Sequence, residues 1–182
     1  MQLYYNNNNI IFLDALQDAV TGSYINDATL KFTLCYTGTG YEGEITNITS
    51  ATPGVVTSAA HGLSNGDQVA IRKVNGVIAA IGIQTVANKT ANTFEMSGTT
   101  TTGTFIDTSA TDDPAKWYLA VPGLVQLSMS YVSSSNGRYA ATVPGTAFIT
   151  SRVRYKGYVE ATDATYKNKL NFWLDVDVVD RT

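Results

Sequence analysis

Apolar and polar residues alternate along most of this chain, and a period of two is typical of β-strands that bury one face. The clearest run lies at residues 170–178, where every second residue is a large apolar one. Similar alternation predicts further outer strands at 10–16, 28–37, 125–131, 139–143 and 151–161. No segment shows the 3.6-residue period of an amphipathic helix. The pattern therefore predicts an all-β chain.

In the middle of the chain the predicted strands are shorter, and they are joined by turns that contain Gly, Asn and Asp. Its predicted strands are 45–51, 55–58, 67–74, 77–81, 83–87 and 92–97, and Asn75-Gly76 favours a tight type I′ hairpin. Because turn-rich segments flank it on both sides, we expect residues 45–109 to form a small domain inserted into a loop. The outer domain, residues 1–44 and 110–182, has about seven strands, which favours an immunoglobulin-like β-sandwich.

Composition excludes several classes of partner. The 182 residues carry a net charge of −3 and only 15% charged residues, which argues against a nucleic-acid or anionic-membrane binder. No apolar run approaches the length of a membrane helix, and no signal peptide is recognisable. Cys35 is the single cysteine, in a predicted strand, and we expect it to be buried. The lack of disulfides suits synthesis in a reducing cytoplasm.

The last two predicted strands carry opposite charges on their outward faces. A turn centred near residues 164–165 would place Arg154 opposite Asp175 and Arg152 opposite Asp177, as cross-strand ion pairs. Asp175 and Asp177 could instead hold a calcium ion, but ion pairing is the preferred interpretation. Trp173 shares this outward face, where a loop or the inserted domain covers it or a partner contacts it.

Few residues suggest chemistry. His61 is the only histidine, so no two-histidine metal site is possible, and we expect it to be a structural turn residue. The other residues assigned to this turn are Gly62, Asn65, Gly66 and Asp67. A Ser58–His61–Asp67 catalytic set would lie within one short loop without the glycines of a nucleophile elbow. We therefore expect no enzyme activity, no cofactor and no metal.

The central segment resembles a known module. The strings VVTSAAHGLSNGDQV (55–69) and VANKTANTFEM (86–96) look like a small β-barrel module of bacteriophage tail and other virion proteins. That module is similar to the first catalytic-cysteine half-domain of ubiquitin-activating enzymes. The match covers about 60 residues, and the loop before the second string is shorter here than in the usual motif. The module carries no catalytic residue, so the resemblance implies a small β-barrel and no activity.

The flanks resemble phage proteins more loosely. The string IFLDALQDAVTGSYINDAT (11–29) and the tripeptide GRY (137–139) are similar to segments of small immunoglobulin-like virion proteins. The implied class is a structural component of a tailed-phage virion, a capsid decoration or cement protein that binds the major capsid protein. A neck or tail accessory protein is the near alternative. By analogy the protein would form a homo-oligomer.

Another functional class stays open, a module that binds a glycan on the host surface. Clustered aromatics would favour it, but Phe94 is the only aromatic residue between residues 45 and 96. Tyr4 and Tyr5 form a short edge strand or an arm on a neighbour, and with Trp173 they are the expected partner contacts.

Overall fold

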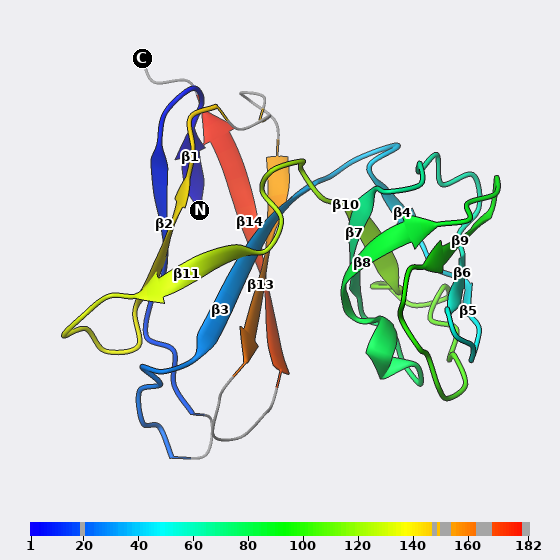
Figure 1. The fold of residues 1–182 in the computed structure, drawn as a ribbon, viewed down its shortest axis with the longest axis horizontal. Coiled ribbons are helices and arrows are strands. Elements are labelled where there is room, and N and C mark those ends of the chain that lie inside the picture. Colours follow the sequence, from blue (N-terminus) through cyan, green and yellow to red (C-terminus); the bar gives the residue numbers. More distant parts are fainter. Residues whose placement is uncertain (19–20, 147–148, 150–153, 163–168, 180–182) are drawn as a thin grey trace. The chain divides into compact units, whose positions relative to one another are not determined.

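The computed structural model describes residues 1–18, 21–146, 149, 154–162 and 169–179. These residues contain no α-helix; one 3-10 helix, η1 (Ile78–Ala80), accompanies two seven-stranded sheets. This confirms the predicted fold class, all-β with a β-sandwich and a barrel-like region (Figure 1). The chain divides into two compact units, Met1–Leu34 with Val121–Thr182, and Cys35–Ala120.

The first unit contains one set of seven strands. They are β1 (Gln2–Tyr4), β2 (Asn9–Leu13), β3 (Thr29–Tyr36), β11 (Leu127–Tyr131), β12 (Tyr139–Val143), β13 (Arg154–Thr162) and β14 (Lys169–Val179). Their order is β1-β14-β13-β3-β11-β12-β2, with β1 parallel to β14. β11 pairs with β3 along its first part and with β12 at its end, so it turns the corner between the two layers of the sandwich.

Alternation along the strands builds the core of this unit. Leu30, Phe32 and Leu34 on β3 are fully buried, as their spacing predicts, and so are Tyr155 and Val159 on β13. The strand ends that flank the second unit are also tied together, since the Val121 N–H donates to the Leu34 carbonyl oxygen at 2.8 Å. A loop whose ends already meet accepts a long insertion at little entropic cost.

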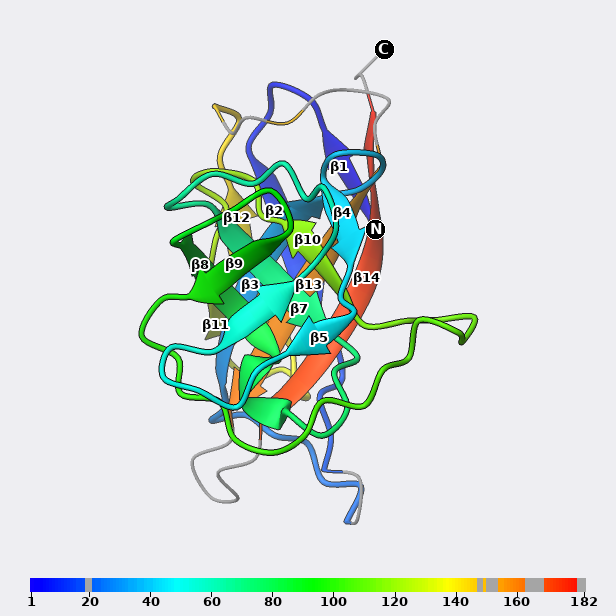
Figure 2. The same ribbon diagram turned by 90° about the vertical axis from the view of Figure 1, so that its right-hand side faces the viewer.

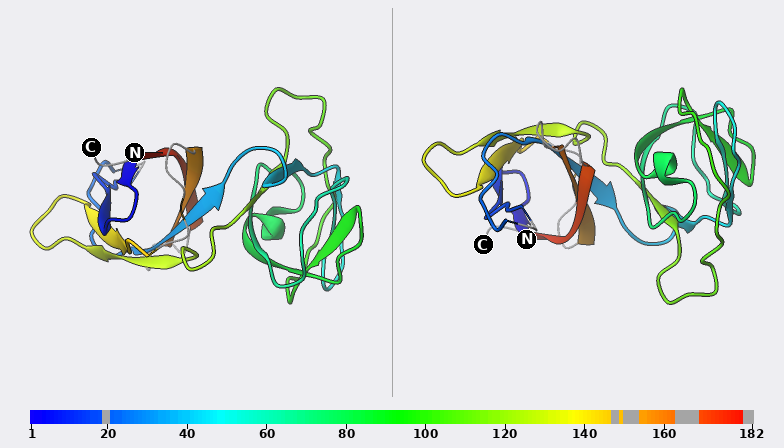
Figure 3. Two further views of the ribbon diagram at one scale, coloured as in Figure 1. Left: turned by 90° about the horizontal axis from the view of Figure 1, so that it is seen from above. Right: turned by 90° about the horizontal axis from the view of Figure 1, so that it is seen from below.

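The second unit closes its sheet into a barrel. Its strands are β4 (Glu42–Glu44), β5 (Asn47–Ile48), β6 (Val55–Thr57), β7 (Gln68–Arg72), β8 (Gly82–Ala87), β9 (Thr93–Met96) and β10 (Lys116–Leu119). The order is β4-β10-β7-β8-β9-β6-β5. β4 and β5 lie at opposite ends of this order yet are separated by only two residues, so one segment pairs with β10 on one side and with β6 on the other. Figure 2 shows this cyan segment, and Figure 3 shows the resulting ring.

Several local predictions for this unit are wrong. Asn75-Gly76 does not form a two-residue hairpin, because β7 and β8 pair across a longer connection of residues 73–81. Residues 77–81 were predicted as a strand but contain η1, and Asn75 instead bridges to Ile106. Residues 116–119 form β10, a strand of this barrel, so the unit extends from Cys35 to Ala120, beyond the expected span of 45–109.

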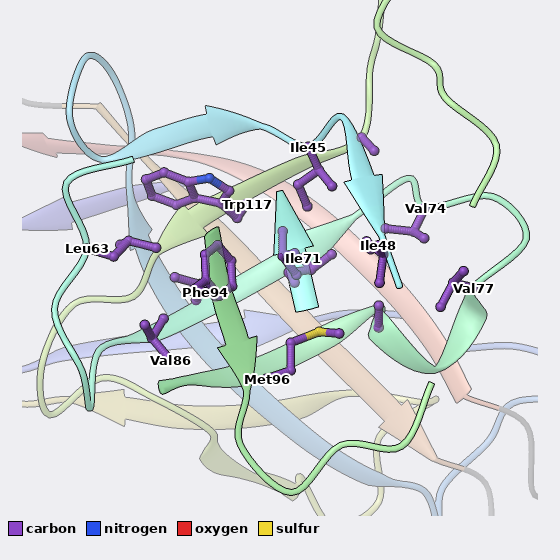
Figure 4. Close-up of a cluster of buried hydrophobic side chains, with 14 residues drawn as sticks. Ile45, Ile48, Leu63, Ile71, Val74, Val77, Val86, Phe94, Met96 and Trp117 are labelled. Carbon is purple, nitrogen blue, oxygen red and sulfur yellow. The ribbon is translucent and has the colours of Figure 1, made fainter. Parts of the chain in front are cut away.

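Trp117 is the largest side chain of the barrel's hydrophobic core (Figure 4). Its indole is 1% exposed, and its Nε1–H donates to Ser58 Oγ at 2.8 Å. Gly43 on β4 makes room for the ring, since a Cβ there would lie 2.6 Å from Nε1. The remaining core residues are apolar and come from β5 to β9 and from the segments that join the strands: Ile45, Ile48, Val56, Val69, Ile71, Val86, Phe94 and Met96 among them.

The Trp117–Ser58 hydrogen bond predicts energetic coupling. Ser58→Ala should cost about 1–3 kcal/mol of unfolding free energy, because it leaves a buried indole N–H without an acceptor. Trp117→Phe should also destabilise the protein, by leaving a cavity. The double variant should lose less than the sum of the two, by on the order of 1 kcal/mol, in a double-mutant cycle measured by calorimetry. Strictly additive losses would contradict the predicted coupling.

Candidate functional site

His61 is a structural residue of the loop that precedes β7. It is 4% exposed, and its ring packs edge-on against Phe94 with centroids 5.4 Å apart. Nδ1 accepts a hydrogen bond from the Leu63 N–H at 3.0 Å, and Nε2 lies 3.2 Å from the Thr93 carbonyl oxygen. Together these contacts require the neutral tautomer with the proton on Nε2, which satisfies both nitrogens.

The rest of the turn is hydrogen-bonded in the same way. Gly62 and Gly66 have φ of +69° and +92°, a backbone conformation that glycine adopts without strain. Asp67 Oδ2 accepts from the Ser64 N–H at 2.7 Å, which closes the loop on itself. Asn65 Oδ1 accepts from the Lys89 N–H at 3.0 Å. The turn predicted from the sequence therefore uses its polar side chains to satisfy backbone groups.

These bonds join the two strings that carry the resemblance to the virion module. His61 reaches Thr93, Asn65 reaches Lys89, and Asn92 Oδ1 accepts from the Ala60 N–H at 2.9 Å. Backbone pairs extend the connection, including the Gly66 N–H to the Val86 carbonyl oxygen at 2.8 Å. The turn at residues 61–67 and the segment at residues 86–96 thus form one hydrogen-bonded structure.

Ser58, His61 and Asp67 do not combine into a catalytic set. Ser58 Oγ accepts from Trp117, both nitrogens of His61 contact backbone groups, and Asp67 accepts from Ser64. Cys35 is fully buried, as expected, and burial raises the pKa of its thiol. A thiol with a raised pKa is a poor nucleophile, so Cys35 has a packing role.

Hydrogen bonds also join the two segments of the first unit that resemble virion proteins. Tyr139 is 1% exposed, and its hydroxyl donates to the Ile25 carbonyl oxygen at 3.1 Å and accepts from the Ala28 N–H at 2.9 Å. The Gly137 N–H donates to Asn26 Oδ1 at 2.9 Å. A Cβ on Gly137 would lie 2.4 Å from the Leu16 carbonyl oxygen, so only glycine fits there. The tripeptide at 137–139 thereby anchors the loop within residues 11–29.

The predicted register of the last hairpin is wrong by two residues. Arg154 lies opposite Asp177, and Lys156 lies opposite Asp175, with Lys156 Nζ 2.8 Å from Asp175 Oδ1. The pairs still lie on the outward face, because a shift of two residues keeps every side chain on its side of the sheet. Arg152, the other predicted cation, lies outside the described residues.

The three expected partner contacts differ in exposure. Tyr4 and Tyr5 are 42% and 37% exposed. Trp173 is only partly exposed, because it packs against Tyr158 directly across the hairpin, with ring centroids 5.0 Å apart. The sequence pattern did not single out Ile10 and Phe12 on β2, two of the other exposed apolar residues, although the uninterrupted apolar run at 10–13 was a usable signal.

An ion cluster ties the loop before β10 to β7. Asp113 contacts both Arg72 and Lys73, and these contacts, Lys73 foremost, hold the pKa of Asp113 below its usual range. In the described part of the chain, no group of three acidic, histidine or cysteine side chains is placed to hold a metal ion. No helix among those residues is long and apolar enough to cross a membrane.

His61 provides a test of the turn. His61→Ala should cost about 2–4 kcal/mol, because two backbone groups lose a partner and the contact with Phe94 is lost. His61→Asn should cost less, since its side-chain oxygen can still accept from the Leu63 N–H. Urea unfolding followed by Trp117 fluorescence in a Trp173→Phe background reports on the second unit. An Ala variant as stable as the parent would refute this role.

Asp113 predicts a pH-dependent contribution to stability. Its pKa is lowered from 3.8 in the folded protein, so its stabilising effect is present above that value and is lost as the pH falls through the folded pKa. Asp113→Asn should therefore lower the melting temperature at neutral pH, and the difference from wild type should shrink below about pH 4. A difference that is constant from neutral pH to below pH 3 would contradict the ion-cluster explanation.

The resemblance stands on these residues alone. No protein-family model matches the chain, and no curated protein matches it. The geometry of the site is therefore what can be used to argue function: two units whose characteristic loops are tied internally, and a set of exposed apolar side chains on the first unit.

Proposed function

We propose that this protein is a structural component of a tailed-phage virion, a decoration or cement protein of the capsid that binds the major capsid protein. In this proposal it is made in the host cytoplasm and resides in the virion. A neck or tail position is the alternative placement within the same class. The first unit would dock, and the second would project or clamp a neighbour.

One observation carries the proposal. In each unit, the two separate segments that resemble virion proteins are hydrogen-bonded to each other: His61 with Thr93 in the second unit, and Tyr139 with Ile25 and Ala28 in the first. If the likeness of these short strings were accidental, we would not expect their residues to be hydrogen-bonded to one another in the folded unit. The support is for the likeness of fold, and the function follows from it by analogy.

The physical character of the surface is compatible with assembly. The net charge is −3 over 182 residues, so neighbouring copies on a lattice would repel one another little. Exposed apolar side chains on the first unit offer contact area without charge. Many copies of a weak contact gain strength together on a symmetric shell.

A glycan-binding module remains a second candidate because of one aromatic pair. Tyr41 is 46% exposed, and its ring stacks on Tyr36 with centroids 4.8 Å apart. An exposed ring held in place by a second ring is a suitable platform for the apolar face of a sugar. Phe94, the aromatic residue between residues 45 and 96, is fully buried and offers no such platform.

The test is to disrupt purified phage particles gently, separate the fragments by sedimentation and find which fraction contains the protein. We expect it to sediment with empty capsid shells in many copies per shell. Sedimentation with necks or tails in few copies would move it to the alternative placement. Absence from the particles would overturn the virion proposal, and binding of Tyr41→Ala and wild type to host-surface glycan would then be compared.

A further inference from the structure

In the described residues, the strand order of the first unit ends at β1 on one side and at β2 on the other, and β2 is the longer of these two edge strands. β2 ends the strand order, with β12 on one side of it. On the other side, in the part of the chain that the structure describes, only the Asn9 side chain reaches across. Its Oδ1 accepts from the Tyr4 N–H at 2.7 Å and its Nδ2 donates to the Tyr4 carbonyl oxygen at 2.9 Å. Past Asn9, no described strand pairs with residues 10–13 on this side.

This strand lacks the features with which edges are normally protected. Residues 9–13 read NIIFL, without a charge, a proline or a glycine. Ile10 is 62% exposed and Phe12 is 47% exposed. Their neighbours across the ladder, Thr142 and Ala140, are too small to cover them.

The charges beside β2 neutralise each other. Arg138 forms an ion pair with Asp14, and its guanidinium carbon lies 5.3 Å from the centre of the Phe12 ring. A charged segment docking here would face this closed pair and an apolar strand. The edge therefore favours an extended, uncharged strand with apolar residues at alternate positions.

β2 itself has this chemistry. In an antiparallel pair of two copies centred on Ile11, Ile10 lies opposite Phe12 of the second copy, and Asn9 lies opposite its Leu13. Asp14 then meets Asn8, so no like charges face each other in the register. A two-fold contact of this kind is self-complementary, the commonest arrangement in soluble oligomers.

We propose that β2 is a self-association edge, at which two copies of this chain pair their β2 strands antiparallel and bury Ile10 and Phe12. The contact would supply the homo-oligomer that the proposed function expects, and the inference rests on that function only for its biological use. The oligomeric state is measured on purified protein, without particles. A failure of this contact is therefore distinguishable from a failure of the virion proposal.

Matched lysine substitutions test the edge. Wild type should show a concentration-dependent dimer in sedimentation-velocity experiments, and Ile10→Lys should weaken it by more than about tenfold, since a lysine there opposes an apolar partner. Ile78→Lys, an equally drastic change at a 75% exposed site in the second unit, should leave the dimer intact. A wild type that stays monomeric, or an Ile10→Lys variant that dimerises like Ile78→Lys, would overturn the proposal.

Cross-linking tests the register. Directly opposite residues of an antiparallel pair bring their Cα atoms within the span of a disulfide. A mixture of Ile10→Cys and Phe12→Cys proteins should therefore form a mixed disulfide-linked dimer under mild oxidation, whereas neither protein alone should. Cys35 is fully buried and should not compete. Equal cross-linking of each single variant with itself would overturn pairing centred on Ile11.

Discussion

The backbone groups at the ends of each sheet must find partners, and this constraint shapes both units. The second unit meets it by using one segment twice: β4 pairs with β10, and β5, two residues later, pairs with β6. Closure places Gly43 against the Trp117 ring and gives Ile45, at the bend between the two strands, no exposure to solvent. The enclosed core and the buried Trp117–Ser58 hydrogen bond both depend on that closure.

The first unit meets the same constraint only in part. β1 covers β14 over Asp177–Val179, and the amide of Asn9 imitates one pair of ladder hydrogen bonds with Tyr4. A side-chain amide can replace a strand for one residue because it carries one donor and one acceptor in nearly the backbone arrangement. It cannot do so for the whole of β2. The two units therefore differ in whether a strand edge is open to pairing with another chain. The second unit closes into a ring, and the first keeps the edge of β2.

Alternation predicted the local structure well because it reports which face of a strand is buried. Phe94 and Met96, and Leu30, Phe32 and Leu34, are all buried as their spacing predicts. The register of the last hairpin could not be obtained in this way, because a shift of two residues, from Asp175 to Asp177 opposite Arg154, preserves the alternation. The double pairing of residues 42–48 and the role of β10 in the barrel were missed for a related reason. Both depend on partners far along the chain, and a local pattern carries no information about them.

The residues that make the sequence recognisable form hydrogen bonds within their own unit, and this limits what a resemblance can say about function. The polar side-chain atoms of His61, Asn92 and Tyr139 form hydrogen bonds with backbone groups of their own unit. A relative that shared them would share the turns and need not share a partner. In such a fold, the specificity of binding depends on the outward-facing residues of the strands. The apolar residues among them are not part of the hydrophobic core. Ile10 and Phe12 are in that position, because Ile11 between them already supplies the buried contact of β2. The fold of the single chain does not require these two side chains to be apolar. A contact with another chain explains their hydrophobicity.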